Sequence, residues 1–248
     1  MKIRLRPFFV PAVMVACCAL LLSLAHNAPS ETAMWLMDYA EEKQIPFSSY
    51  PASLIDLLER NPETEEFVLN YPFREEKPVD LSGYDTETGV PLFLQWDEQW
   101  GYLTYGSDCV GITGSGPMCL AMAGYYVSGG AEKYSPDQVV SFVLKNGYCV
   151  KGNAEGWNLI SRGGEAMGLT VKELPIVERK VADYLKNGDP VIASMSPGSF
   201  DNYIVITGYR DGVITVNDPD SRANSEKEWV FAEISDQIRN LWVIRMAP

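Results

Sequence analysis

The pattern of apolar and polar residues marks the start of the chain as a targeting segment. Three basic residues, Lys2, Arg4 and Arg6, precede a mainly apolar run over 8–25. That run is long for the core of a cleaved signal peptide and just long enough to cross a bilayer as a helix. We expect residues 1–28 to be a signal peptide or a membrane anchor, with the basic end inside the cell and the rest of the chain outside.

The next apolar positions recur at helical spacing. Residues 32–43 form an amphipathic stretch, residues 51–60 carry apolar side chains on one face, and residues 62–71 follow Asn61, a residue type that caps helices well. We predict a short helical N-terminal region over 29–73. Because short helices cannot bury their apolar faces alone, this region should pack on the domain that follows.

The rest of the chain changes from helical to strand-like patterns. Residues 74–89 are acidic, polar and rich in turn formers, which predicts a linker before a domain over 90–248. Residues 90–170 are helix-rich, whereas 171–244 contain runs of β-branched and aromatic residues bounded by Gly, Pro and Asp. These runs lie at 191–193, 203–207, 213–217 and 241–244. The division predicts an α+β domain.

One helix start carries the candidate chemistry. Residues 118–126 form an apolar, helix-compatible run that follows Gly114, Ser115, Gly116 and Pro117. Glycines permit a sharp backbone turn and proline suits a first helical turn, so Ser115 should lie at a helix N-terminus. There the helix dipole favours negative charge, as needed to hold a cysteine nucleophile as a thiolate. A serine needs a base instead, and the simpler interpretation is that Ser115 caps the helix.

No base of the usual kind accompanies this serine. The sequence contains one histidine, His26, and it lies in the predicted targeting segment. An imidazole partner for residue 115 is therefore missing from residues 29–248.

Several other motifs occur in a fixed order around this helix start. They are Val90-Pro91-Leu92-Phe93-Leu94-Gln95-Trp96-Asp97, Trp100-Gly101-Tyr102, Tyr105-Gly106, the Ser115 segment, Trp157, Tyr203-Ile204-Val205-Ile206-Thr207-Gly208-Tyr209 and Val216-Asn217-Asp218-Pro219-Asp220-Ser221. Together they resemble the bacteriocin-processing-peptidase-like group of papain-like proteins, the family-thirty-nine-like cysteine peptidases of Gram-positive bacteria. The resemblance implies a papain-like cysteine peptidase fold, a helical half plus an antiparallel sheet, with a cleft between the helix at 115 and the strand after 202.

The resemblance also implies roles for four positions. It places a catalytic cysteine at Ser115, a histidine at Asn202, an orienting Asp or Asn at Asp218 and an oxyanion-hole glutamine at Gln95. Serine and asparagine occupy the two positions that carry the chemistry, and the connection before the strand is shorter than the family's. We therefore predict a pseudopeptidase with no catalytic residue, whose retained cleft binds a peptide or a cell-wall glycopeptide.

Two other functions stay open as alternatives. One is an active hydrolase of peptide bonds in which Ser115 uses an unusual base, namely Asp201, Asp218, Tyr203 or a lysine. The other is a non-catalytic structural domain of the cell surface. In that case Trp157 is retained as a large core residue and Asp218 as a turn former.

Charge narrows the set of partners. Without Lys2, Arg4 and Arg6, 17 basic residues remain against 33 acidic ones, a formal charge of −16. Such a domain should not bind nucleic acid or an anionic membrane surface by charge attraction, so membrane association is expected through the N-terminal segment alone. A cationic peptide or wall component is the easier ligand, although an acidic surface also keeps an exported protein soluble. We expect an exported protein, either anchored in the membrane and facing outside or secreted.

The cysteines add a structural expectation. Two of the five lie in the apolar run, which leaves Cys109, Cys119 and Cys149 in the exported part. Cys119 is one turn into the predicted helix and should face the core. Cys109 and Cys149 lie in expected loops, where they are either free or joined by a disulfide. The sequence has no zinc, haem or phosphate-loop pattern, and we expect no cofactor.

Overall fold

The computed structural model describes residues 29–149, 157–196 and 203–248, which form two compact units that divide between Ser49 and Tyr50. The first unit contains α2 (Glu31–Glu42) and the short helix η1 (Phe47–Ser49). The predicted targeting segment, 1–28, lies outside the described residues. Among the residues that are described, no helix is long and apolar enough to cross a membrane.

Helix α2 begins at a cap that the sequence encodes. The Ser30 side chain accepts a hydrogen bond from the Ala33 N–H at 3.0 Å, which satisfies one of the free donors at the helix start. Leu36 and Ala40 are buried on one face. The predicted amphipathic helix over 32–43 is confirmed.

The second unit starts with short helices that bury an apolar face. They are α3 (Ala52–Arg60), η2 (Pro62–Thr64), α4 (Glu65–Asn70) and η3 (Tyr71–Phe73). Leu54 and Leu57 of α3 are fully buried. The Asn61 side chain accepts the Glu63 N–H at 3.1 Å, so Asn61 acts as the predicted cap. The helix after it differs from the prediction in that its first turn is a 3₁₀ turn.

Residues 74–103 connect these helices to the rest of the unit without any helix or strand. The predicted linker 74–89 lies here. Its side chains Val79, Leu81 and Tyr84 are partly buried and pack against the core. The segment therefore contributes apolar surface to the fold.

The helical half of the unit is built around one buried helix. Its elements are the hairpin β1 (Thr104–Tyr105) and β2 (Asp108–Cys109), α5 (Val110–Thr113), α6 (Ser115–Val127), η4 (Glu132–Tyr134), α7 (Pro136–Lys145), the π-helical turn η5 (Leu159–Gly163) and α9 (Gly164–Ala166). Helix α6 is buried from Ser115 to Tyr125 and contacts α7, η4, η5 and the sheet. A helix that is apolar on all sides is stable only in such a setting, which explains why the run 118–126 carries no polar face.

The other half is a six-stranded antiparallel sheet in the order β3-β8-β4-β5-β6-β7. The strands are β3 (Leu169–Leu174), β4 (Val191–Met195), β5 (Tyr203–Arg210), β6 (Val213–Asn217), β7 (Glu228–Val230) and β8 (Ile238–Met246). The four predicted strands are confirmed as β4, β5, β6 and β8. The prediction missed β3 and β7, which both lie at edges of the sheet: β3 carries several exposed polar residues, and β7 has only three residues.

The two faces of the sheet bury different sets of side chains, as the alternation of residues along a strand requires. Ile192 and Trp242 pack with α6 in one cluster, whereas Ala193 and Val243 pack in a second cluster. That second cluster includes residues of α10 (Glu178–Leu185) and α12 (Phe231–Ile234). The predicted α+β class, a helical half plus an antiparallel sheet, is therefore confirmed.

The short helices at the start of the second unit are held against the turn that follows β6. The Arg60 guanidinium donates to both carboxylate oxygens of Asp220, and the Asn61 Nδ2 donates to the Asp220 carbonyl. The ion pair is partly shielded, since the Asp220 side chain is 11% exposed. The expectation that this region packs on the domain is confirmed for α3 and η2.

Glu63 adds a second attachment at the same turn. Its carboxylate accepts the Ser221 hydroxyl at 2.6 Å and the backbone N–H groups of Arg222 and Ala223 at 3.1 and 3.3 Å. These two N–H groups begin the short helix α11 (Arg222–Ser225), whose first donors have no partner within the helix. The Glu63 carboxylate, from a distant segment, thus accepts hydrogen bonds from N–H groups at the start of α11.

We predict that Gly124→Ala lowers the free energy of unfolding. A β-carbon at 124 would lie 2.5 Å from Cδ1 of Tyr134, a fully buried ring whose hydroxyl donates to the Met167 carbonyl at 3.0 Å. The overpacking should cost about 1–3 kcal/mol, which exceeds the gain of about 1 kcal/mol from alanine's helix propensity. Urea unfolding measures the difference. Gly83→Ala is the control, since nothing lies within 4 Å of its new β-carbon, and an equal loss there would contradict the packing argument.

We predict that Glu63→Gln also destabilises the second unit, by about 1–3 kcal/mol, because the charged acceptor of three hydrogen bonds becomes a neutral amide. Glu59→Gln is the matched control, an exposed carboxylate near the end of the preceding helix α3. Urea unfolding of the two variants separates the attachment from a general charge effect. Equal stability of both variants would show that the Glu63 contacts contribute nothing.

Candidate functional site at the start of helix α6

Ser115 is the first residue of α6, and Gly114 precedes it as the N-cap. The Gly114 N–H already bonds to the Val110 carbonyl at 2.8 Å, so the backbone is nearly helical across the junction between α5 and α6. No side-chain cap is present at this helix start. The prediction that Ser115 caps α6 is wrong, because a cap residue must lie outside the helix for its side chain to turn back to the first N–H groups.

The Ser115 hydroxyl has little access and no activating partner in the described part of the chain. The residue is 4% exposed, and its Oγ makes no hydrogen bond with any described residue. Serine becomes a nucleophile when a base accepts its proton, and no described side chain does so. No described residue therefore activates the hydroxyl.

The glycines around Ser115 serve close packing. Neither Gly114 nor Gly116 has a positive φ, so the expectation that they permit a sharp turn is wrong. A β-carbon at 114 would lie 2.4 Å from the Val110 carbonyl oxygen, and one at 116 would lie 2.9 Å from Cδ2 of Leu159. Small residues are required here because α5, η5 and the sheet approach the helix start closely.

Tyr203, the first residue of β5, covers the other side of the helix start. Its ring carbons Cδ2 and Cε2 lie 3.6 and 3.7 Å from where a β-carbon of Gly116 would be. Burial raises the pKa of the Tyr203 phenol to about 12, and a hydrogen bond with Ser194 acts in the opposite direction. The phenol is therefore neutral at physiological pH and cannot serve as a strong base.

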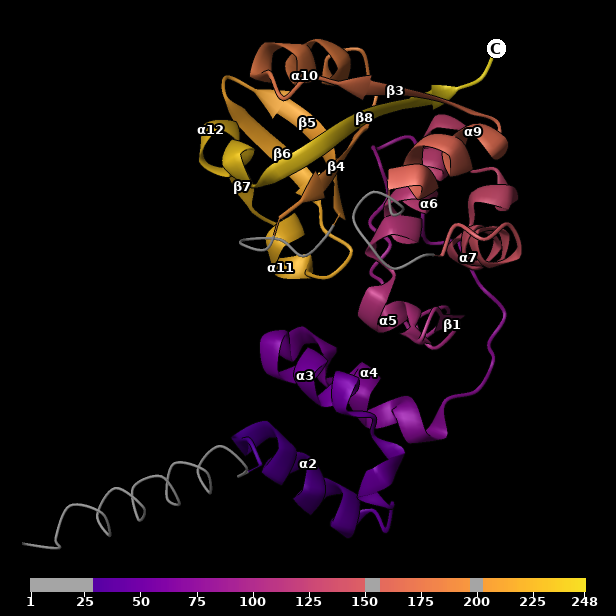
Figure 1. Cartoon of the computed structure of the whole chain (residues 1–248), viewed down its shortest axis with the longest axis vertical. Coiled ribbons are helices and arrows are strands. Elements are labelled where there is room, and N and C mark those ends of the chain that lie inside the picture. Colours follow the sequence, from indigo (N-terminus) through magenta and orange to yellow (C-terminus); the bar gives the residue numbers. More distant parts are fainter. Residues whose placement is uncertain (1–28, 150–156, 197–202) are drawn as a thin grey trace, which may run out of the picture. The chain divides into compact units, whose positions relative to one another are not determined.

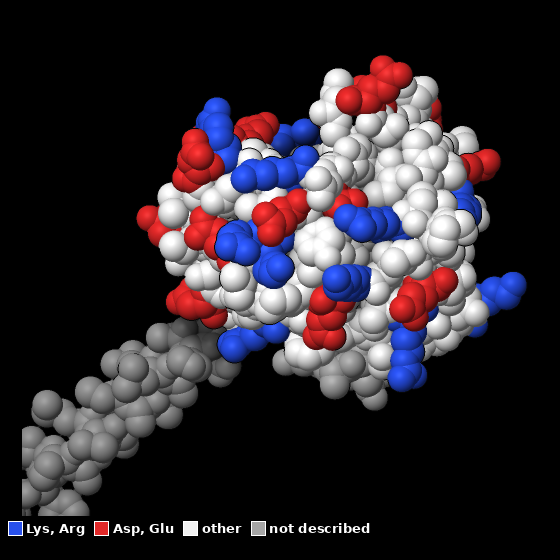
Figure 2. Space-filling view, turned by 90° about the horizontal axis from the view of Figure 1, so that it is seen from above, with Lys and Arg blue, Asp and Glu red and all other residues white. Residues whose placement is uncertain are grey.

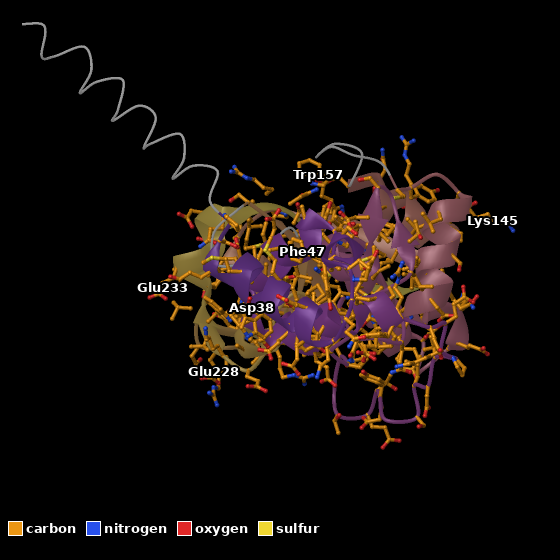
Figure 3. All side chains as sticks on the ribbon, turned by 90° about the horizontal axis from the view of Figure 1, so that it is seen from below. Asp38, Phe47, Lys145, Trp157, Glu228 and Glu233 are labelled. Atoms are coloured by element: carbon orange, nitrogen blue, oxygen red, sulfur yellow. The ribbon has the colours of Figure 1, made fainter. Side chains whose placement is uncertain are left out.

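Trp157 extends this wall from the helical half to the sheet. Its Nε1 donates to the Ser194 hydroxyl at 3.3 Å, and its ring packs edge-on against Trp242 at a centroid distance of 6.1 Å. Figure 3 shows Trp157 at the upper edge of the view, with Glu233 at the left side and Lys145 at the right side. The indole is partly buried, so it combines packing with a polar contact near residues 194 and 203.

Gln95 is buried, 2% exposed, and its amide is committed to protein acceptors. Its Nε2 donates to the Gly111 carbonyl at 3.2 Å and to Oδ1 of Asp220 at 2.9 Å. Its backbone N–H bonds to the Pro219 carbonyl at 2.7 Å. Gly111 precedes Ser115 by about one helical turn, so this contact brings Gln95 near the start of α6. The Oε1 atom is buried and has no hydrogen-bond partner in the described structure.

Asp220 is the residue that joins these groups, and the sequence did not indicate it. Its carboxylate accepts from Gln95 and from Arg60, and its carbonyl accepts the Trp96 Nε1 at 2.9 Å as well as the Asn61 side chain. The available signal was the Asp-Pro-Asp spacing after β6 together with an arginine at the end of a predicted helix. Neither pattern specifies a contact across 160 residues.

Asp218 is 1% exposed and turned into its own turn. Its Oδ1 accepts the Asp220 N–H at 2.9 Å, its Oδ2 accepts the Asn224 Nδ2 at 2.8 Å, and its N–H bonds to the Ser225 hydroxyl. These contacts confirm that Asp218 forms a turn. The family-equivalent partner position, Asn202, lies outside the described residues, as does Asp201.

The cysteines resolve one open alternative. Cys119 is fully buried, as predicted, and its pKa is raised well above the usual value by burial and then by the charge of Asp218. Cys109 and Cys149 are both free, so the alternative of a disulfide is wrong. The Cys149 thiol lies against Gly106 in the turn between β1 and β2, whereas Cys109 lies at the far end of that hairpin. In the described part of the chain, no cluster of three potential metal ligands exists.

Two other surface features, a cavity and the distribution of charge, do not indicate a ligand site at the start of α6. A cavity of about 520 Å³ is lined by residues of 74–79, 98–104 and α7, and none of the family-equivalent positions belongs to it. On the face shown in Figure 2, basic and acidic side chains are interspersed. The overall acidity of the chain therefore does not produce a single-sign patch on that face.

Comparison with known proteins identifies the family. A profile described as the Peptidase_C39 like family matches residues 88–245. No curated protein matches the chain. Among solved structures, the peptidase domain of Streptococcus ComA, described as a bi-functional ABC transporter involved in a quorum sensing pathway, is 16% identical. That match covers 54% of this chain and 90% of the ComA domain, with a TM-score of 0.38. Because the family profile spans more than half of the sequence, the chain belongs to the Peptidase_C39 like family.

Proposed function

We propose that this protein is an extracytoplasmic pseudopeptidase, a papain-like domain without peptidase chemistry whose cleft binds a peptide or a cell-wall glycopeptide. The observation that carries the proposal is the state of Ser115. It stands where the family resemblance places a cysteine nucleophile, and its hydroxyl has no described partner that could accept its proton.

The absence of a histidine from residues 29–248 supports this proposal. Papain-like chemistry requires a thiolate paired with an imidazole, and the only histidine of the chain is His26. Neither of the two buried cysteines of this region is suited to replace the nucleophile. Cys119 is buried in the core with a strongly raised pKa, and Cys109 is buried with a pKa of about 11, again because of burial.

Gln95 and Asp218, the two positions whose residue types match the family, also support the proposal, because both make structural contacts. Gln95 would have to donate to an oxyanion, but both of its N–H bonds point to Gly111 and Asp220. Asp218 would have to orient a base, but both of its carboxylate oxygens accept from residues of its own turn. A site that stabilises a transition state needs donors free to meet the developing charge.

The alternative of an active serine hydrolase has less support. Of its candidate bases, Tyr203 is neutral at physiological pH because its pKa is about 12, and Asp218 is held within its turn. The second alternative, a purely structural domain, differs from the proposal only in whether the cleft binds a ligand.

The location and the ligand charge form part of the proposal. The basic residues and the apolar run at the start of the chain support export, with the domain tethered to the outer face of the membrane or released. The acidic surplus supports a cationic rather than an anionic ligand.

We predict that the protein is inert toward reagents that report an active nucleophile. A fluorophosphonate probe and iodoacetamide should both leave residue 115 unlabelled at neutral pH, since no described base accepts the proton of its hydroxyl. Peptide mapping by mass spectrometry measures this, with Ser115→Ala as the control. Fluorophosphonate labelling of Ser115 in the wild type would overturn the proposal and establish the serine hydrolase.

We predict that cationic peptides bind the full chain and that Ser115→Leu weakens binding at least about tenfold, because the larger side chain fills the start of the cleft. Fluorescence anisotropy with labelled, randomised cationic decapeptides measures the affinity, and acidic decapeptides of equal length are the comparison. Ser82→Leu, at an exposed loop position, is the matched control. If no peptide binds, or if both variants bind as the wild type does, the cleft is not a peptide site and the structural alternative holds.

A further inference from the structure

The second unit has an elongated groove beside α7 whose lining includes none of the family-equivalent positions. The cavity of about 520 Å³ described above is lined by residues of 74–79, 98–104 and α7. A second cavity, of about 320 Å³, shares Val79 and Asp137 with it and continues to Tyr125. Because the cavities share these walls, they form one groove, which we call the α7 groove. Both volumes fall within the range of ligand pockets, about 300–1,000 Å³.

The lining of the α7 groove includes apolar side chains that the core holds in place. Trp100 is 1% exposed, and Val79 and Leu103 are partly buried and pack against the core. The Asp80 N–H donates to Oε1 of Gln99 at 2.7 Å, which ties the segment that carries Val79 to the opposite wall. The groove therefore has fixed walls with apolar surface in them.

The two basic side chains of the lining are already engaged. The Lys77 Nζ donates to Oε2 of Glu98 at 2.8 Å. The Arg74 guanidinium lies 3.9 Å from the centre of the Tyr71 ring and donates to the Tyr71 carbonyl at 2.7 Å. Within the described structure, neither base forms an ion pair with another carboxylate of the groove.

The other carboxylates of the lining have no cationic partner among the described residues. The carboxylates of Glu75 and Glu76 in the first cavity and of Glu132 in the second make no hydrogen bond or ion pair with any described residue. Asp137, which lines both cavities, accepts hydrogen bonds from uncharged side chains. Carboxylates on one groove repel each other, and a cation between them relieves that repulsion.

Exposed apolar side chains flank these carboxylates. Phe73, which is 59% exposed, directly precedes the lining residue Arg74. Leu144, which is 43% exposed, lies three residues after the lining residue Ser141 and thus on the same face of α7. The groove therefore presents unpaired negative charge and apolar surface together.

We infer that the α7 groove binds a cationic, amphipathic peptide segment. Its lysine or arginine side chains pair with the free carboxylates, and its apolar side chains lie on Val79, Leu103 and Leu144. Charge complementarity favours this occupant over an acidic peptide, and the apolar walls favour it over a bare polycation. This site is separate from the cleft of the proposed function and does not depend on it.

A charge-matched pair of variants tests the site on the full chain. The probe is a fluorescein-labelled octapeptide of alternating lysine and leucine, and fluorescence anisotropy at low salt measures its affinity. Ser141→Arg places a cation in the groove, and arginine is a good helix former, so α7 should persist. We expect Ser141→Arg to weaken binding at least about tenfold and Ser48→Arg, at an exposed position of η1, to change it less than about twofold. Equal affinities of the two variants would overturn the inference.

Removal of the free carboxylates is the complementary test. Glu75→Gln combined with Glu76→Gln should weaken binding about three- to tenfold, because two exposed ion pairs with the peptide are lost. Glu41→Gln combined with Glu42→Gln, an exposed pair on α2, changes the net charge equally and is the control. If the control pair weakens binding as much, the effect is one of overall charge and the groove is not the site.

Two further probes define the ligand class. An octapeptide of alternating glutamate and leucine should not bind, and spermine should displace the labelled peptide far less well than the unlabelled peptide does. Binding of the acidic peptide, or equal displacement by spermine, would overturn the assignment to a cationic amphipathic peptide. On the wild type, NMR titration should shift the N–H signals of residues 74–79 and 98–104, and shifts confined to other residues would also overturn it.

Comparison of Ser141→Arg with Ser115→Leu separates this site from the proposed cleft. Weakening by Ser115→Leu alone would place the peptide in the cleft and refute the groove. Weakening by Ser141→Arg alone would support the groove and refute peptide binding in the cleft, and weakening by both would support two contacts. Labelling of Ser115 by a fluorophosphonate would refute the pseudopeptidase and leave the groove standing.

Discussion

The burial of helix α6 on every side is the constraint on which the second unit depends. Eleven consecutive residues, from Ser115 to Tyr125, are buried between α7, η4, η5 and the sheet. Such a helix can lie only in the middle of the unit, so its neighbours must approach it closely. This explains why glycine occurs at 116 and 124, where a β-carbon would meet Leu159 or the Tyr134 ring. It also explains why Ser115 is nearly inaccessible, since Tyr203 packs over the first turn.

The carboxylate of Asp220 is the second organising feature, and it connects segments far apart in the chain. It accepts from Arg60 at the end of α3 and from Gln95 ahead of β1. Buried or half-buried charges are tolerated when they are paired and hydrogen-bonded, and here the pairing also fixes the direction of the Gln95 amide. Removing the arginine would leave a carboxylate without its charged partner. The end of α3 is thus part of the environment of the candidate site.

The sequence predicted those features that depend on local patterns. Amphipathic spacing located α2 and α3, β-branched runs located four strands, and Asn61 was identified as a cap from its residue type alone. The order and spacing of the motifs were sufficient to identify the family. Features that depend on three-dimensional neighbours were not predictable. The cap at Ser115 failed because α5 continues the helical backbone into Gly114, and the hairpin geometry that keeps Cys109 and Cys149 apart has no local signature.

The contacts of Gln95 and Asp218 show why matching residue types do not establish a function. Both residues occupy positions that the resemblance associates with catalysis, and the amide nitrogen of Gln95 and both carboxylate oxygens of Asp218 bond to groups of the protein itself. In a hydrolase the nucleophile, the base and the oxyanion donors must converge on one reacting carbonyl, and each group is held ready without another partner. In this chain the donor of Gln95 satisfies Asp220, and the carboxylate of Asp218 satisfies a turn. These hydrogen bonds hold the turn after β6 and its contact with residue 95, so a residue type that matches the family does not by itself show that its polar atoms face a substrate.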